Sequence, residues 1–385
     1  MAQDVNNFFE EQKDWSRRKL AIVGSYLAGF SKILGNRSFQ QCVYFIDGFA
    51  GAGQYKDGSK GSPLLSAELA FRYQNEQKPY RINCINIEEN EDNFQNLVSV
   101  TAPFNGLVVN YSGTFSANLD LILNQIGNCP GLFFIDPFGV KGLDWVDIMK
   151  ITHRRAPTDL WIRFDHRNVR RLSGFFDSGS RGADSKFQNL QNLYGVHRPD
   201  ILSQLLHGNT AEERINKALN LYVRNLEEEF IKSRNTGYSA AFPIVSLGGE
   251  TKYHLVFAAA HQKAAMLASK TVYSAERNRT LERQDYLQKK SGQLFLFSPE
   301  PTEDEFFVFI VEQLRSDIVR LCAGQQLSRE EVFMLLIQDN GKKWFGRFSD
   351  KHLNSALTLL ESEKTPIIQS KNGPNSKDKT IFTFR

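Results

Sequence analysis

The sequence predicts an α/β fold with a parallel sheet, followed by a smaller domain rich in helices. Two apolar runs, residues 43–46 and 132–135, each lead without a break into an acidic residue and a turn. Unbroken apolar runs of this length are typical of strands buried on both faces of a parallel sheet. Beyond residue 300 the apolar spacing becomes that of helices. We therefore expect a sheet domain over residues 1–280 and a second domain over residues 301–385.

Length and composition agree with a large globular protein. At 385 residues, the chain exceeds what one hydrophobic core usually covers. The net charge of +4 is too small to indicate a polyanionic partner by itself, so any basic patch must be local. The four cysteines are far apart in sequence and form no C-x-x-C pair (Cys42, Cys84, Cys129 and Cys322). This favours buried thiols in a reducing compartment over disulfides or a metal site.

No apolar stretch approaches the ~18 residues that a membrane span needs, and the N-terminus lacks the apolar core of a signal peptide. We expect a cytoplasmic protein with no membrane partner.

Residues 6–36 predict a helix, because apolar residues recur there at intervals of three to four. Arg17, Arg18 and Lys19 lie between the apolar positions. The pattern favours a helix packed on the sheet over a face that binds nucleic acid.

The first strand leads into Asp47 and the small-residue turn Gly48 to Gly53. Glycine allows positive φ angles and close approach of a ligand to the backbone. Ligands of open α/β sheets bind beyond the carboxyl ends of the strands, so this turn is a candidate ligand site. The third glycine of the dinucleotide fingerprint is missing, which disfavours NAD. A simple tight turn is the alternative.

The segment after this turn predicts a ligand-covering loop and a second strand. Ser62-Pro63 is a helix start, so residues 54–61 form a loop that is free to fold over a ligand. A strand over residues 82–87 ends in Glu88, where α/β cofactor folds bind ribose hydroxyls. A solvated strand end is the alternative for Glu88.

The second acid-tipped strand leads into Asp136-Pro137-Phe138-Gly139. Proline removes a backbone donor and leaves the preceding carbonyls free as acceptors. A carboxylate, free carbonyls and an aromatic ring suit a flat substrate that carries an amino group. Two strand ends of this type in one chain are more specific than either one alone.

Three segments, Tyr44 to Gly53, Gly61 to Pro63 and Phe134 to Gly139, together resemble the three-Cys-motif partner protein (TcmP) family. Those proteins are similar to class I S-adenosylmethionine-dependent methyltransferases. The resemblance extends over about residues 12–280 and implies a seven-stranded Rossmann-like sheet that ends in an antiparallel hairpin. The sequence indicates that hairpin independently, as apolar runs at 238–247 and 252–259 around a glycine turn.

The resemblance also implies S-adenosylmethionine as the cofactor, with site residues at matching positions. The methyl-donor loop would comprise Asp47, Gly48, Phe49, Gly51 and Gly53. Glu88 would bind the ribose, and Thr114 and Phe115 would contact the adenine, although the acid usual there is absent.

The second motif carries the catalytic residues that the resemblance implies. Asp136, Pro137 and Phe138 match the Asp/Asn-Pro-Pro-aromatic motif of amino-methyltransferases, with one proline instead of two and the ring one position early. Asp136 would then orient the target amine for methyl transfer, mainly by positioning.

An insertion over residues 166–208 interleaves arginines, among them Arg167, Arg170 and Arg171, with aromatic residues. Arginines contact phosphates and rings stack on bases, so the insertion is a candidate nucleic-acid or substrate lid. An ordinary subdomain with its own small core is the alternative.

Residues 281–300 mix charge with glycine and proline and predict a linker. Beyond it, three helices and a β-hairpin predict a winged-helix domain, whose second helix begins at a capping box of Ser328 and Glu331. Its candidate nucleic-acid contacts precede the third helix or lie in the hairpin turn (Lys342, Lys343, Arg347, Lys371 and Lys377). Such a domain also serves as a protein docking module.

The function predicted from the sequence is methyl transfer from S-adenosylmethionine, to a base amine in nucleic acid that is flipped into the pocket if the target is a duplex. The alternative is an inactive adaptor of the same fold, which partners a three-Cys-motif protein in bacterial defence against phage, as the resemblance implies. A third interpretation is a DNA-binding regulator whose core senses a nucleotide.

Overall fold

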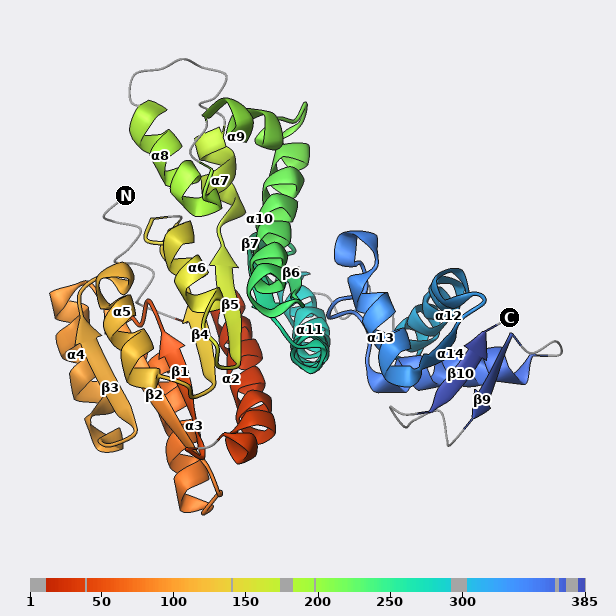
Figure 1. The fold of residues 1–385 in the computed structure, drawn as a ribbon, viewed down its shortest axis with the longest axis horizontal. Helices are drawn as coiled ribbons and strands as arrows, with labels where there is room; N and C mark the ends of the chain where they lie inside the picture. The colour runs from red at the N-terminus through yellow and green to blue at the C-terminus, as the bar shows by residue number, and fades with distance from the viewer. Residues whose placement is uncertain are drawn as a thin grey trace. The chain divides into compact units, whose positions relative to one another are not determined.

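The computed structural model describes residues 12–38, 40–139, 141–173, 183–196, 199–291, 303–363, 367–371 and 380–384. The chain forms two compact units, Met1–Ala265 and Met266–Arg385 (Figure 1).

The first unit contains a seven-stranded sheet with the strand order β3-β2-β1-β4-β5-β7-β6. Its strands are β1 (Cys42–Asp47), β2 (Arg81–Glu88), β3 (Val108–Ser112), β4 (Gly131–Ile135), β5 (Thr158–Phe164), β6 (Tyr238–Val245) and β7 (Thr251–Ala259). Strands β1 to β5 pair in parallel, whereas β7 is antiparallel to both β5 and β6. This confirms the predicted Rossmann-like sheet and its terminal hairpin.

Helices connect and cover these strands (Figure 1). They are α2 (Asp14–Leu34), η1 (Gly35–Arg37), α3 (Ser62–Asn75), α4 (Glu91–Thr101), η2 (Ala102–Phe104), α5 (Phe115–Ile126), α6 (Trp145–Thr152), α7 (His166–Ser173), α8 (Ala183–Tyr194), α9 (Pro199–Leu206) and α10 (Ala211–Arg234). Helix α2 packs on β1, β4 and β6, as the sequence favoured. The part of its predicted span before residue 12 lies outside the described residues.

Burial on both faces explains why the sequences of the central strands are continuous apolar runs. Side chains on both faces of β1 and β4 are buried, including Val43, Phe45, Leu132 and Phe133, as parallel strands between two helical layers require. In the register of these two strands, Asp47 lies opposite Phe134. Both strands therefore end at the same edge of the sheet, which brings their two acids together.

The insertion after β5 folds as helices α7, α8 and α9. Its apolar side chains, such as Leu190 and Leu202, belong to the same core cluster as Tyr222 of α10. Tyr194 packs against Tyr222 with ring centroids 6.0 Å apart. These contacts favour the subdomain interpretation for the described part of the insertion.

A long helix, α11 (Gln262–Ser291), crosses the division between the units. It corrects the predicted linker, because residues 281–291 are helical. The helix continues there because strong helix formers fill the segment and the first glycine after it is Gly292. Residues 292–302 lie outside the described part of the chain. The division itself falls between Ala265 and Met266, before the predicted position near residue 280.

The second unit combines helices with a three-stranded antiparallel sheet of order β8-β10-β9. Its further elements are α12 (Glu303–Cys322), β8 (Gln326–Ser328), α13 (Arg329–Gln338), η4 (Asn340–Lys342), α14 (Asp350–Ser362), β9 (Ile368–Lys371) and β10 (Ile381–Phe384). The predicted helices, the predicted hairpin and the capping box of Ser328 and Glu331 are present. The sequence did not predict the short strand β8. The assignment as a winged-helix domain stays a prediction.

Candidate active site

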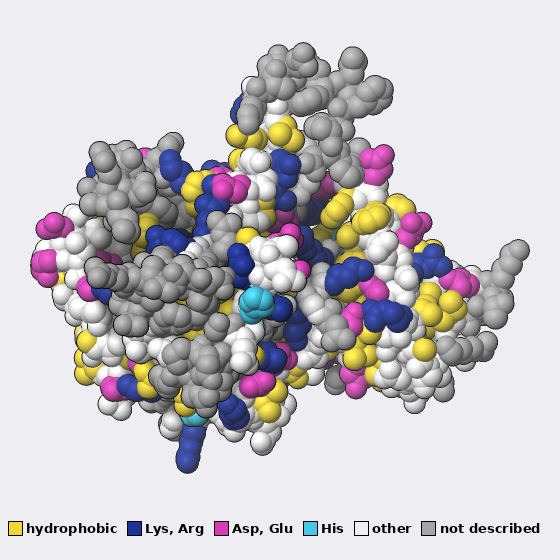
Figure 2. All heavy atoms as spheres, turned by 90° about the horizontal axis from the view of Figure 1, so that it is seen from above, with side chains coloured by type: hydrophobic (Ala, Val, Ile, Leu, Met, Phe, Trp, Pro, Cys, Tyr) yellow, Lys and Arg dark blue, Asp and Glu magenta, His cyan; other side chains and the backbone are white. Residues whose placement is uncertain are grey.

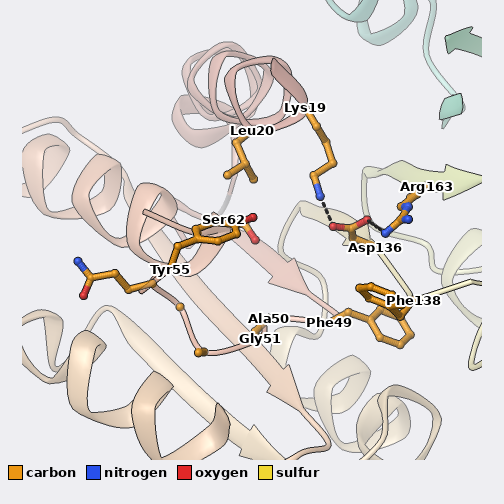
Figure 3. Close-up of a pocket in the computed structure, with 14 residues that line it drawn as sticks. Lys19, Leu20, Phe49, Ala50, Gly51, Tyr55, Ser62, Asp136, Phe138 and Arg163 are labelled. Atoms are coloured by element: carbon orange, nitrogen blue, oxygen red, sulfur yellow. Dashed lines mark hydrogen bonds and ion pairs between the residues drawn. The ribbon is translucent and has the colours of Figure 1, made fainter. Parts of the chain in front are cut away.

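A pocket opens at the edge of the sheet where β1 and β4 end (Figure 3). Part of the space between its lining residues is open to solvent. The lining residues come from α2, from the turn and loop after β1, and from the ends of β4 and β5. They are Lys19, Leu20, Phe49, Ala50, Gly51, Ala52, Gly53, Gln54, Tyr55, Gly61, Ser62, Asp136, Phe138 and Arg163. Five of the predicted cofactor and catalytic residues are among them: Phe49, Gly51, Gly53, Asp136 and Phe138.

The glycine turn after β1 has a backbone that other residues rarely adopt. Gly51 has φ +62° and Gly53 has φ +76°, in the left-handed region that glycine enters without cost. A Cβ atom on Gly53 would lie only 2.8 Å from Cγ2 of Val100. The Gly61 N–H donates to the Gly53 carbonyl at 2.9 Å, so the loop after the turn holds it in place. The turn therefore offers bare backbone to a ligand in the pocket.

Asp47 is fully buried behind this turn and is not part of the pocket lining. The Phe49 N–H donates to its Oδ1 at 3.2 Å, whereas its Oδ2 accepts no hydrogen bond from the described residues. Burial raises the pKa of Asp47 to about 7, although the Ser62 hydroxyl and the Phe49 N–H act in the opposite direction. The turn thus covers a fully buried carboxyl group, and burial favours its neutral form.

Glu88, at the end of β2, ties that strand to the glycine turn. Its Oε2 accepts a hydrogen bond from the Gly51 N–H at 2.8 Å, and its Oε1 accepts one from the Asn90 N–H at 2.9 Å. Glu88 is half-buried and lies next to the pocket lining through Gly51. Its predicted contact with a ribose stays a prediction.

Thr114, Phe115 and Gly48 do not line the pocket. Phe115 is only 3% exposed and packs against Phe49, with ring centroids 5.9 Å apart. A Cβ on Gly48 would lie 2.9 Å from the Phe115 ring, so this glycine makes room for the ring. Thr114 caps helix α5 by accepting from the Ala117 N–H. These residues shape the site by packing and capping, and the adenine contact expected for Thr114 and Phe115 stays a prediction.

Asp136 faces the pocket and is held by two cations from other elements (Figure 3). Lys19 of α2 donates to its Oδ2, and an Arg163 nitrogen, from β5, lies 3.5 Å from its Oδ1. The side chains of Lys19 and Arg163 are only 5% and 13% exposed. Oδ1 accepts no hydrogen bond from the described residues. The pocket therefore contains a largely buried charge cluster.

The sequence reasoning missed Lys19 and Arg163 as site residues. A signal was present for Arg163, which interrupts the apolar strand Leu160-Trp161-Ile162-Arg163-Phe164. A charged residue within a buried strand needs an ionic partner, and the sequence alone does not reveal which one. Lys19 carried a weaker signal, as a basic residue in a helix that packs on the sheet.

Aromatic rings surround the charge cluster. The Arg163 guanidinium lies 4.7 Å from the centroid of the Tyr253 ring and 5.6 Å from that of Phe138. Phe138 is 54% exposed, whereas Pro137 is buried. The ring of Phe138 thus combines a contact with Arg163 and a large exposed surface beside the pocket.

The predicted nucleic-acid contacts of the insertion are engaged within the chain. Arg167 forms an ion pair with Glu250 and donates to the Thr251 carbonyl. Arg171 donates to Asn168. The side chain of Arg170 lies outside the described atoms.

The predicted contacts of the second unit are scattered. Lys343 forms an ion pair with Asp317 at 2.9 Å, and Lys342 ends the turn η4. Arg347 has an exposed side chain. Partial desolvation by the surrounding chain nevertheless lowers the pKa of its guanidinium group. The side chain of Lys371 and all of Lys377 lie outside the described atoms. On the face shown in Figure 2, basic and acidic side chains are interspersed. A nucleic-acid interface stays a prediction.

The cysteines are buried free thiols, as predicted. Cys42 and Cys129 nevertheless come together, with sulfur atoms 3.0 Å apart, at the start of β1 and just before β4. Burial is the main reason that the pKa of Cys42 is raised to about 12.

Among the described residues, no group of His, Cys, Asp and Glu side chains is placed to bind a metal ion. The helices of the described segments include none that is long and apolar enough to span a membrane.

Comparison with known proteins gives distant structural similarity alone. No family model and no curated protein matches the chain. The O-methyltransferase TomG from Streptomyces achromogenes, solved with S-adenosylmethionine, is 12% identical over 67% of this chain and 94% of its own, with a TM-score of 0.31. An O-methyltransferase from Bacillus cereus, solved with S-adenosylhomocysteine, is 12% identical over 67% and 96%, with a TM-score of 0.30. A putative O-methyltransferase from Klebsiella pneumoniae is 13% identical over 67% and 94%, with a TM-score of 0.27. Likenesses this remote carry no argument, so the fold assignment rests on the strand order, and membership of the TcmP family stays a prediction.

Proposed function

We propose that this chain is an S-adenosylmethionine-dependent methyltransferase. The observation that supports this most directly is the position of the pocket. It opens at the ends of β1 and β4, the adjacent strands at which the order of the parallel sheet reverses. Cofactors of open α/β sheets bind at this switch point. The glycine turn and Asp136 face each other across it, as a donor site and an acceptor site would.

The residues present fit S-adenosylmethionine. This cofactor carries a methyl group on a positively charged sulfur atom, next to an amino acid moiety and a ribose. The backbone at Gly51 and Gly53 allows close approach of the amino acid moiety. The unpartnered Oδ2 of Asp47 would gain an interaction from a nearby positive charge. The Glu88 carboxylate, at the end of the neighbouring strand, would bind the ribose.

The acceptor site would work by positioning. Asp136 would accept a hydrogen bond from the acceptor group while the Phe138 ring stacks on the substrate. Holding the two reactants in line removes much of the entropic cost of the reaction. In support of this, Asp136 directly follows β4 and Phe138 lies two positions further along the chain.

A specific acceptor, a base amine in nucleic acid, was predicted from the sequence. The Asp136-Pro137-Phe138 segment supports it, but Lys19 and Arg163 already occupy the carboxylate that would bind the amine. The same ion pairs favour the second candidate function, an inactive adaptor that partners a three-Cys-motif protein. In that case the charge cluster would serve to hold α2, β4 and β5 together.

Calorimetry with S-adenosylmethionine and S-adenosylhomocysteine tests the proposal. We expect micromolar binding that Asp47→Ala abolishes and Glu88→Gln weakens by about tenfold or more, since a charge-assisted hydrogen bond is lost. Glu89→Gln is the matched control, because Glu89 is exposed beside Glu88, and it should bind as the unaltered chain does. If neither compound binds to the unaltered chain, the methyltransferase proposal is wrong and the adaptor is favoured.

A second experiment separates an enzyme from a nucleotide sensor. Methyl transfer from radiolabelled S-adenosylmethionine to total nucleic acid and to a small-molecule extract should occur and be lost in Asp136→Ala. Cofactor binding without transfer to either pool would support the sensor or the adaptor.

A further inference from the structure

The charged groups that line the pocket do not balance. They are Lys19, Arg163 and Asp136, so the lining has an excess of one positive charge. Further acids lie behind it: Asp165 is 3.9 Å from Arg163, and Asp47 is buried with a pKa of about 7, raised mainly by burial. The phenols of Tyr55 and Tyr253 remain protonated at neutral pH, because burial raises the pKa of each. The acceptor position therefore faces two cations and one carboxylate in the pocket lining, while a second carboxylate, Asp165, pairs with Arg163 from outside the lining.

The two common acceptor groups respond differently to such a position. An amine becomes positively charged as it attacks a methyl group on sulfur, and nearby cations oppose that change. A hydroxyl group reacts as an oxyanion or nearly so, and nearby cations stabilise that charge. The low exposure of Lys19 and Arg163 limits screening by water, which strengthens either effect.

We infer that the acceptor is a hydroxyl group of phenol-like acidity, which Lys19 and Arg163 stabilise as an oxyanion beside Asp136. This inference rests on the proposed methyltransferase function and departs from the base amine that the sequence predicted. The exposed ring of Phe138, which lies beside Arg163 in the pocket, gives the aromatic ring of such an acceptor a surface to stack on.

The reaction would balance with the bound cofactor. S-adenosylmethionine would supply its methyl group to the acceptor oxygen and leave as the neutral thioether S-adenosylhomocysteine, with the electrons of the broken S–CH₃ bond on sulfur. The hydroxyl proton would pass to the carboxylate of Asp136, whose side chain is 14% exposed, and from there to water. Lys19, which donates to Oδ2, keeps the carboxylate oriented during this step.

The test uses para-nitrophenol, whose ionised form absorbs visible light, with the full chain saturated in S-adenosylhomocysteine. At a pH below the probe's own pKa, we expect the ionised fraction to rise when the probe binds. Lys19→Met should weaken binding of the ionised probe by about tenfold or more, since one charge-assisted contact is lost. Lys19→Arg should retain binding, because it retains the charge. Lys150→Met removes a surface ion pair with Asp120 and should change nothing.

Three outcomes would overturn the inference: the probe binds in its neutral form, para-nitroaniline binds as tightly, or neither probe binds to the saturated chain. The measurement on the unaltered chain decides among them even if Lys19→Met does not fold. Calorimetry detects separately whether S-adenosylhomocysteine binds, so a failure of the proposed function is distinguished from a failure of this inference.

Discussion

The ends of β1 and β4 look alike in sequence and differ in electrostatics. Each buried strand leads into one aspartate and a turn, at the same edge of the sheet. Asp47 accepts a hydrogen bond from the backbone of Phe49, and burial raises its pKa to about 7, with only smaller effects from the charges of Asp136 and Lys19. Asp136 is held by Lys19 and Arg163. The comparison teaches that a strand places an acid, whereas side chains from distant elements decide what charge that acid carries.

Removal of Asp136 should give the largest effect. Asp136→Ala leaves the buried Lys19 without its ion-pair partner and leaves Arg163 with Asp165 alone, which costs about 3–5 kcal/mol of unfolding free energy. Urea denaturation measures this loss. In the double variant Lys19→Met/Asp136→Asn, the loss of unfolding free energy should be smaller than the sum of the losses in Lys19→Met alone and Asp136→Asn alone. A loss below about 1 kcal/mol in Asp136→Ala would show that the cluster is effectively solvated.

The second largest effect on stability should come from the glycine turn after β1, and it should exceed the effect in the turn after β4. Gly53→Ala forces a left-handed φ on alanine and puts Cβ 2.8 Å from Val100 and 3.1 Å from Leu97, so we expect a loss of about 2–3 kcal/mol. Gly139→Ala has the same backbone problem at φ +92°, but its nearest neighbour is the movable amide of Asn168 at 3.3 Å. Its loss should be about 1 kcal/mol smaller. Equal losses, measured by thermal unfolding, would contradict the packing argument.

Asp47→Asn should stabilise the chain, in contrast to any change at Asp136. The folded-state pKa of Asp47 lies above its usual value of 3.8, mainly because of burial. Its contribution to stability is therefore complete below about pH 4 and is lost as pH rises through about 7. The unfolding free energy of Asp47→Asn should exceed that of the unaltered chain by on the order of 1 kcal/mol at about pH 8 and should equal it at acidic pH. Melting curves across pH measure this, and a constant difference would disprove the raised pKa. Cofactor binding should weaken in the same variant.

Phe138→Ala should give the smallest change in stability. The ring is largely exposed, so the unfolding free energy should stay within about 0.5 kcal/mol. Binding of para-nitrophenol should still weaken, because the stacking surface is gone. If stability falls by more than about 1 kcal/mol, the ring belongs to the core and not to the acceptor site.

The sequence predicted what depends on local pattern. The buried strands and the capping box of Ser328 with Glu331 follow from residues close in sequence. The partners of Asp136 could not be predicted, because Lys19 precedes it by 117 positions and Arg163 follows it by 27. Only the packing of α2 and β5 brings the three side chains together. The packing of Phe115 could not be predicted for the same reason, since its partner Phe49 lies on another element.

The paired thiols of Cys42 and Cys129 give this sheet a built-in reporter. They lie at the opposite ends of the strands that carry the two acids, and both are buried. An alkylating reagent can reach them only when β1 and β4 separate locally. The labelling rate of these sulfurs therefore measures how often β1 and β4 separate. Cofactor bound at the other end of these strands should slow the labelling.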